Sequence, residues 1–184
     1  MIQNFRVVTK NGLCAFVDVG GEVFFKKNQP KELLMEVVNT YNSGIQWESK
    51  GLTVTLLNDK SIIGYPSIDL NYVIAIYFGK DEEFFPPHNA VIYNADGSIH
   101  KVLQVPALKS DFLLNRIRFN KDNNPALEIA QFEGGIYFSQ FSWKKHNNKI
   151  VNAIDICYDR EYYESQILNP ETGEFGDCLF SWRN

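Results

Sequence analysis

Short runs of β-branched and aromatic residues follow one another along the chain, and this feature constrains the fold more than any other. Each run is bounded by Gly, Asn, Asp or Pro, which favour turns, so the pattern predicts antiparallel strands joined by hairpins. The fold class is therefore mainly β, an antiparallel β-meander. The expected strands are Phe5–Thr9, Leu13–Val19, Leu52–Leu57, Tyr72–Phe78, Ala90–Tyr93, Ile99–Val105, Leu127–Phe132, Ile136–Trp143 and Ile150–Tyr158.

Two of these runs differ in their periodicity. Tyr72–Phe78 is apolar at every position, which predicts a strand covered on both faces. In Ile150–Tyr158 the apolar side chains of Ile154, Ile156 and Tyr158 alternate with others that include Asp155. That alternation is typical of a half-buried strand with one polar face.

One segment, near residues 30–42, has helical rather than strand periodicity. Leu33, Leu34, Val37 and Val38 recur at the spacing of a helix face, and Pro30 suits a first helical turn. We expect one amphipathic helix that lies over a sheet and buries its apolar stripe there.

Turn signals recur along the chain every 37 to 39 residues, at 20–21, 59–60, 96–97, 134–135 and 172–173. Such a period is compatible with propeller-like repeats, because propeller blades commonly run to about 40 residues. The helix near residues 30–42 interrupts the first repeat, and turn residues are frequent in any β protein. We therefore prefer the plain meander and keep propeller-like repeats of about 38 residues as the alternative.

Composition sets the outer limits. The chain has 184 residues, of which 45% are hydrophobic, so residues 1–184 are expected to form a single globular domain and not a disordered chain. No apolar run is long enough to cross a bilayer, and the N-terminus has no signal-peptide pattern, which predicts a cytoplasmic protein without membrane contact. Cys14, Cys157 and Cys178 are few, widely spaced and odd in number, which favours unpaired thiols in a reducing compartment.

The charge is concentrated in residues 151–184, which hold seven acidic side chains and two basic ones. A turn at 159–162 would pair Tyr158 with Tyr163 and Ile156 with Ser165 across a hairpin, with acidic side chains on the opposite face. Carboxylates steer and then pair with basic groups, and tyrosine adds contact area, so this face is a candidate partner-binding surface. An ordinary exposed face is the alternative. The candidate residues are Asp155, Asp159, Glu161, Tyr162, Glu164, Glu171, Glu174 and Asp177.

Signatures of enzymes are missing from the sequence. There is no nucleophile elbow, phosphate-binding loop or dinucleotide fingerprint, and His88, His100 and His146 have no metal-ligand spacing. We therefore expect no catalytic residues, no metal and no cofactor. The alternative is a loop site that combines His88 with the carboxylates of residues 81–83, for which an exposed acidic loop is the simpler explanation.

Residues Asn89–Pro106 read as a strand, an Asp-Gly turn and a second strand that ends at Pro106. This hairpin resembles stretches in small bacterial proteins encoded beside the toxins of contact-dependent inhibition and other polymorphic-toxin systems. Those neighbours are immunity proteins, which bind the cognate toxin domain, often a nuclease, and block its active site or its access to substrate. The resemblance implies a cytoplasmic, non-enzymatic, acidic binding protein and carries over no individual functional residue.

These observations lead to one preferred hypothesis and two alternatives. The preferred one is an immunity-type protein whose acidic, aromatic surface neutralises a basic toxin domain and repels nucleic acid. The first alternative is a small-ligand-binding protein or hydrolytic enzyme with a site near His88. The second is a scaffold that binds through sheet edges or β-repeats.

Overall fold

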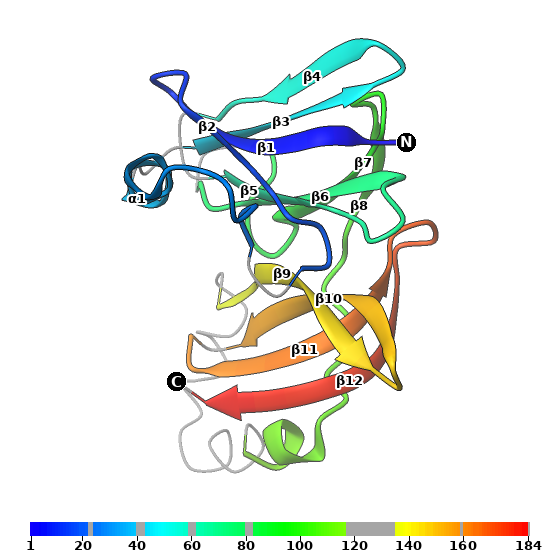
Figure 1. The fold of residues 1–184 in the computed structure, drawn as a ribbon. Helices are drawn as coiled ribbons and strands as arrows, with labels where there is room; N and C mark the ends of the chain where they lie inside the picture. The colour runs from blue at the N-terminus through cyan, green and yellow to red at the C-terminus, as the bar shows by residue number, and fades with distance from the viewer. Residues whose placement is uncertain are drawn as a thin grey trace.

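The computed structural model describes residues 1–21, 24–39, 43–58, 62–79, 83–116, 135–158 and 160–183. Their strands form three four-stranded antiparallel sheets (Figure 1). The N-terminal sheet has the order β2-β1-β3-β4, with β1 (Gln3–Thr9), β2 (Cys14–Phe16), β3 (Ser43–Ser49) and β4 (Leu52–Leu56). The central sheet consists of β5 (Ile62–Pro66), β6 (Tyr72–Tyr77), β7 (Ala90–Asn94) and β8 (Ile99–Val102) in sequence order. The C-terminal sheet consists of β9 (Ile136–His146), β10 (Lys149–Tyr158), β11 (Tyr162–Asn169) and β12 (Glu174–Arg183), again in sequence order.

The three sheets stack as layers, and the central sheet is covered on both faces (Figure 1). Along β6, Ile74 and Ile76 belong to a core shared with the C-terminal sheet, whereas Val73 and Ala75 belong to a core shared with the N-terminal sheet. All four side chains are fully buried. This confirms the prediction that Tyr72–Phe78 is a strand covered on both faces, because successive side chains of a strand point to opposite faces.

The mainly β fold class is confirmed. The central and C-terminal sheets are simple meanders, and among the described residues no ring of propeller blades is present. The regularly spaced turn signals that the structure describes fall at positions that are not equivalent: 96–97 and 172–173 are hairpin turns, whereas Gly20 lies in a loop after β2 and Gly135 directly precedes β9. The signal at 59–60 lies outside the described residues. The propeller alternative is therefore wrong, since the period belongs to turn residues and not to a repeated unit.

The predicted helix is present as α1 (Lys31–Asn39), beside β1 and β2 of the N-terminal sheet. Val37 is buried, whereas Val38 and Met35 are largely exposed, so the stripe that packs is narrower than predicted. A second short helical stretch, residues 111–116, was not predicted. It begins after Ser110, whose hydroxyl accepts a hydrogen bond from the amide of Leu113 at 3.4 Å, as an N-cap does.

Strands β3 and β5 were also not predicted, and both lie where sequence gives a weak strand signal. β3 buries only Ile45 and Trp47 as large apolar side chains, and β5 contains Gly64 and Pro66. Gly64 is required by packing, because a Cβ at this position would collide with the side chain of Ile45. Gly64 thus allows two sheets to approach closely, although a glycine in a sequence usually indicates that a strand is interrupted.

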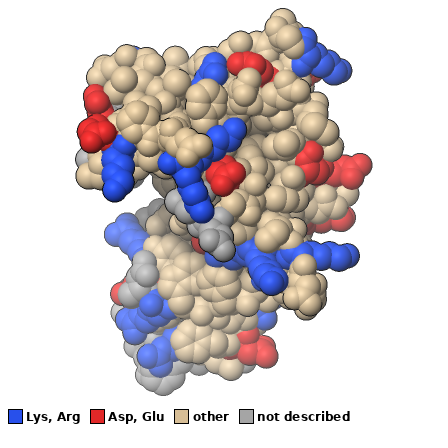
Figure 2. Space-filling model, viewed as in Figure 1, with Lys and Arg blue, Asp and Glu red and all other residues tan. Residues whose placement is uncertain are grey.

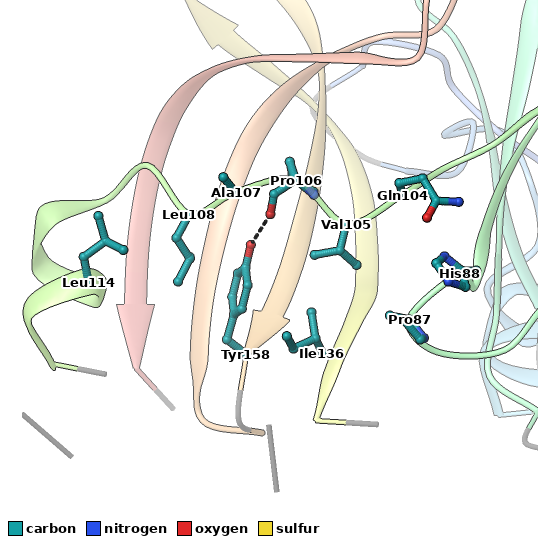
Figure 3. Close-up of a pocket in the computed structure, with 10 residues that line it drawn as sticks. All are labelled: Pro87, His88, Gln104, Val105, Pro106, Ala107, Leu108, Leu114, Ile136 and Tyr158. Carbon is teal, nitrogen blue, oxygen red and sulfur yellow. Dashed lines mark hydrogen bonds between the residues drawn. The ribbon is translucent and has the colours of Figure 1, made fainter. Parts of the chain in front are cut away.

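Residues 103–110, here called the connecting segment, run from the end of β8 over the C-terminal sheet to the helical stretch 111–116 (Figure 3). Leu103 and Leu113 are fully buried and join the core between the central and C-terminal sheets. The predicted strand Leu127–Phe132 lies outside the described residues. The connecting segment therefore forms a cover over one end of the C-terminal sheet and positions the candidate site.

Candidate functional site

The predicted register of the β10–β11 hairpin is wrong by one residue. Tyr158 pairs with Tyr162 and Ile156 with Glu164, not with Tyr163 and Ser165. The connection between the strands is one residue shorter than expected, and a shift of one residue moves every side chain of a strand to the other face. The acidic side chains that were expected on one face are therefore divided between two.

Glu164 lies on the core face of the C-terminal sheet and is fully buried. Its carboxylate accepts hydrogen bonds from the backbone amides of Lys109 and Ser110, both at 3.0 Å, and from the Gln166 side chain at 2.6 Å. Gln166, also fully buried, donates in addition to the carbonyl of Ala107 at 3.1 Å. Glu164 therefore tethers the connecting segment to the sheet and is not accessible to a partner.

Asp155 lies on the opposite face of the same sheet and is only 6% exposed. Burial raises the pKa of its carboxyl group, and Lys144, whose Nζ lies 3.7 Å from Oδ1, opposes that rise. The same ammonium group lies 3.9 Å from the ring centroid of Phe180, and burial lowers the pKa of Lys144. The Ser165 hydroxyl, also buried, interacts with the Asp155 carboxylate and likewise lowers its pKa. Asp155 is therefore a buried carboxylate that pairs with the half-buried Lys144. The prediction of one exposed polar face for Ile150–Tyr158 is wrong, because β10 is buried on both faces from Asn152 to Tyr158.

The other predicted residues have different surroundings. Tyr162 is 2% exposed and belongs to the core, and Asp159 lies outside the described residues. Glu161 is exposed but paired with Arg183, whose Nη2 lies 2.6 Å from Oε2. The remaining acidic side chains, Glu171, Glu174 and Asp177, are exposed together at the β11–β12 turn. Among the predicted residues, a partner can therefore reach Glu171, Glu174 and Asp177 at this acidic turn, and Glu161 at the other end of β11.

The acidic turn is fixed against the central sheet by basic side chains. The ring of His100 forms a hydrogen bond of 2.7 Å with the carbonyl of Glu171, and Lys101 donates to the carbonyl of Thr172. On the face of the molecule drawn in Figure 2, Lys and Arg side chains lie among the Asp and Glu side chains over both halves. That face is of mixed charge and is not a continuous acidic surface.

Two pockets lie where the central and C-terminal sheets meet, and the first contains His88, near which the sequence suggested a loop site as an alternative. They flank the turn of residues 85–89: Pro87 and His88 line the first pocket, and Pro86 and Asn89 line the second. Their volumes are about 540 Å³ and about 530 Å³. We call this region the junction surface. The only sequence signal for it was the Pro86-Pro87-His88 turn.

The first pocket is mainly apolar (Figure 3). His88 and Gln104 lie at one end of it, and Leu108 and Leu114 lie at the other. The hydroxyl of Tyr158 donates to the carbonyl of Pro106 at 3.1 Å and is therefore already engaged. No carboxylate is among its described lining residues. The alternative pairing of His88 with residues 81–83 concerns Asp81 and Glu82, which lie outside the described residues, and Glu83, which lines neither pocket.

The second pocket is more polar. It is lined by Asn89, Tyr137, Ser139 and Arg160 together with apolar residues. Asn89 is fully buried and forms hydrogen bonds of 2.9 Å with both the amide and the carbonyl of Phe138, and it also donates to the carbonyl of Tyr77. These bonds cap the edge strand β9 and fix the central and C-terminal sheets relative to each other.

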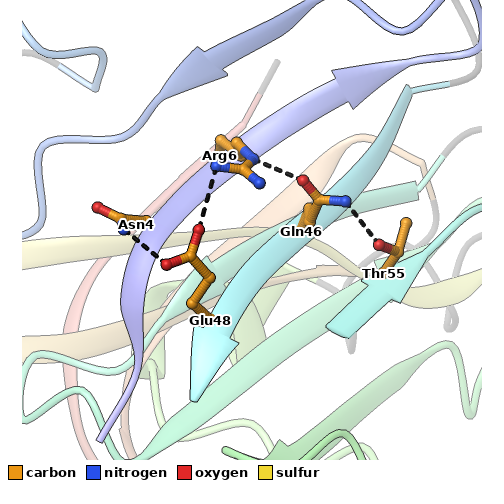
Figure 4. A network of polar contacts seen from close by, with 5 residues as sticks. All are labelled: Asn4, Arg6, Gln46, Glu48 and Thr55. Carbon is orange, nitrogen blue, oxygen red and sulfur yellow. Dashed lines mark hydrogen bonds and ion pairs between the residues drawn. The ribbon is translucent and has the colours of Figure 1, made fainter. Parts of the chain in front are cut away.

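A third polar feature lies on the N-terminal sheet (Figure 4). The guanidinium group of Arg6 donates to Gln46 at 2.6 Å and lies 3.5 Å from a carboxylate oxygen of Glu48. Gln46 donates onward to Thr55, and Asn4 donates to Glu48. The network connects three adjacent strands side chain to side chain, so it stabilises the sheet and leaves little unused hydrogen-bonding capacity for a ligand.

The described residues contain no group of three or more His, Cys, Asp or Glu side chains that could hold a metal ion. Cys14, Cys157 and Cys178 are unpaired. Within the same parts of the chain, no helix has the length and apolar character that a membrane span requires.

Comparisons with known proteins give a likeness of fold. No protein-family model matches the sequence, and no curated protein matches it either. Among solved structures, the chain is similar to one from the structure of Tne2 in complex with Tni2, with a TM-score of 0.58 and 9% sequence identity. The match covers 100% of this chain and 99% of that chain, so the likeness extends over the whole fold.

Proposed function

We propose that this protein is an immunity-type binding protein, which binds a cognate bacterial toxin in the cytoplasm and blocks its active site. The observation that carries the proposal is the full-length likeness of fold to a chain from a complex of two proteins, Tne2 and Tni2. The hairpin within Asn89–Pro106 adds support from sequence, because it resembles immunity proteins. A nuclease is the toxin class that this resemblance favours.

The mechanism is steric occlusion and needs no chemistry from this chain. Three stacked sheets with a core on each side of the central sheet give a rigid body that loses little conformational entropy on binding. The acidic turn, formed by Glu171, Glu174 and Asp177, adds negative charge that attracts a basic toxin. Association is then fast and becomes slower as salt screens the charges.

The test is co-expression with the C-terminal region of the polypeptide encoded immediately beside this protein. We expect that this region alone arrests growth, that co-expression restores growth, and that calorimetry gives a dissociation constant in the nanomolar range. Titrations at two salt concentrations measure the electrostatic part. An adjacent region that is not toxic and does not bind would contradict the proposal.

A further inference from the structure

We propose that the junction surface is the site that receives the toxin, and that one toxin loop occupies both of its pockets. An apolar side chain of that loop enters the first pocket, and a carboxylate of the same loop pairs with Arg160 in the second. The inference rests on the proposed function, because it takes the cognate toxin as the partner.

The two pockets share the turn of residues 85–89 as a wall. The turn of residues 85–89 is a ridge with Pro87 and His88 on one side and Pro86 and Asn89 on the other. The first residues of β9 divide in the same way, since Ile136 lines the first pocket and Tyr137 lines the second. Because successive side chains of a strand point to opposite faces, the two pockets lie on opposite sides of β9, and the toxin loop has to pass over the turn of residues 85–89 to reach both.

The walls of the first pocket are held in place before any partner binds. Polar side chains from the sheet, Glu164, Gln166 and Tyr158, hold the connecting segment by hydrogen bonds to its backbone. Asn89 holds the other wall against β9. The side chains of Glu164, Gln166 and Tyr158 reach from the sheet to the backbone of the connecting segment, and their hydrogen bonds fix its position. A preformed pocket of this kind avoids the cost of ordering its walls on binding.

Exposed apolar side chains around the first pocket favour a protein as the occupant. Phe85, in the turn that carries His88, is 49% exposed, and Leu114, on the opposite wall, is 38% exposed. Phe78, which lines the second pocket, is 40% exposed. A small molecule would fill a pocket and leave these rims in water, whereas a protein loop would cover them.

The charge of Arg160 indicates which group of the toxin loop enters the second pocket. Arg160 is exposed and is the one permanently charged side chain among the described residues that line either pocket. Its chemical complement is a carboxylate, which a guanidinium group can bind through two parallel hydrogen bonds. The acidic turn, by contrast, attracts basic groups. The two surfaces thus select opposite partner chemistry, and charge reversal distinguishes them.

Calorimetry with the toxin region and variants of the full chain tests the inference. Ala107→Trp fills the first pocket and is expected to weaken binding at least about 30-fold, as loss of a central anchor does. Leu114→Asp, at the exposed rim, makes the same test without adding bulk. Arg160→Glu is expected to weaken binding about 10-fold. Thermal unfolding verifies that each variant folds.

Matched controls place the same changes elsewhere. Leu52→Trp adds bulk at an exposed position of β4, and Lys149→Glu reverses a charge at the exposed start of β10. Both are expected to bind the toxin like the unmodified protein. Binding by the junction variants that equals that of the controls would overturn the inference and leave the proposed function intact.

Two further outcomes are informative. If the unmodified protein does not bind the toxin region, the proposed function fails and the inference fails with it. Micromolar binding of 3-phenylpropionate in the first pocket, with no competition between this probe and the toxin, would assign the pocket to a small carboxylate and overturn the inference.

Discussion

The central sheet and the C-terminal sheet are both four-stranded meanders, but they bury different kinds of side chain. In the central sheet, the buried positions of β6 and β7 are apolar on both faces. In the C-terminal sheet, Asp155, Glu164, Ser165 and Gln166 are buried alongside the apolar core. One sheet is stabilised by its neighbours on two sides, and the other by one neighbouring sheet and a hydrogen-bonded segment of chain.

Polar character in a strand therefore does not establish that the strand is exposed. Glu164 is buried because Lys109 and Ser110 supply backbone donors from a segment more than fifty residues away in sequence. A buried carboxylate is stable only when such donors compensate for its lost hydration. The C-terminal sheet therefore depends on hydrogen bonds to buried polar side chains, whereas the central sheet depends on apolar packing. Substitutions can separate these two contributions.

The largest effect is expected at Glu164. Glu164→Ala leaves the amides of Lys109 and Ser110 without their acceptor and creates a cavity, so the free energy of unfolding should fall by about 4 kcal/mol. Urea denaturation measures the change. Glu174→Ala, at the exposed acidic turn, is the control, and its effect should be small. Equal losses for the two variants would contradict the assignment of Glu164 as a tether.

The next effect tests whether the central sheet is covered on both faces. Ile92 packs toward the C-terminal sheet and Val91 toward the N-terminal sheet, and both are fully buried. Ile92→Ala should lower the free energy of unfolding by about 3 kcal/mol and Val91→Ala by about 2 kcal/mol. Ile99→Ala, at a position that is 49% exposed, is the control. If only one of the two buried positions is sensitive, the layered arrangement is incorrect.

A smaller effect is expected at Asp155 and depends on pH. Because burial raises the carboxyl pKa, the folded protein retains a proton at pH values where the unfolded chain has released it. Stability should therefore fall as pH rises from about 4, the ordinary value for Asp, through the raised pKa, and then level off. Asp155→Asn should flatten that fall in denaturation curves recorded between pH 3 and pH 8.

The control for this pH effect is Glu161→Gln, which removes an exposed carboxylate from the turn between β10 and β11. An unchanged pH profile in Asp155→Asn would mean that Lys144 fully compensates for the burial of the carboxylate. The ion pair would then resemble a surface pair in its energetics despite its position.

Sequence predicts β6, in the central sheet, well because the signal of this strand is local. Tyr72–Phe78 is apolar at every position, and only a strand covered on both faces uses such a run in a β protein. The helix near residues 30–42 is equally local, since Leu33, Leu34 and Val37 carry its periodicity. Gly64 misleads for the opposite reason: its role is set by Ile45 on another sheet.

The candidate site could not be predicted in the same way. One residue in the length of the β10–β11 connection decides whether Glu164 lies on the surface or in the core. The donors that make burial possible come from the connecting segment, whose path sequence does not indicate. The junction surface likewise combines the 85–89 turn, the connecting segment and β9, which are distant in sequence, so only the Pro86-Pro87-His88 turn gave a sign of it.

The smallest effect is expected at Glu161, which lies three residues before Glu164. Its ion pair with Arg183 is short, at 2.6 Å, but both side chains are about half exposed. Water and salt screen such a pair, and fixing two long side chains costs entropy, so the net stabilisation is small. The urea midpoint of Glu161→Gln should therefore match that of the unmodified protein within error, at both low and high salt. Glu164→Gln, which makes the same chemical change at a buried position, should shift the midpoint clearly. A difference between these two variants would isolate burial as the cause, because the charge and the substitution are the same. Similar shifts would show that the charge matters more than its surroundings.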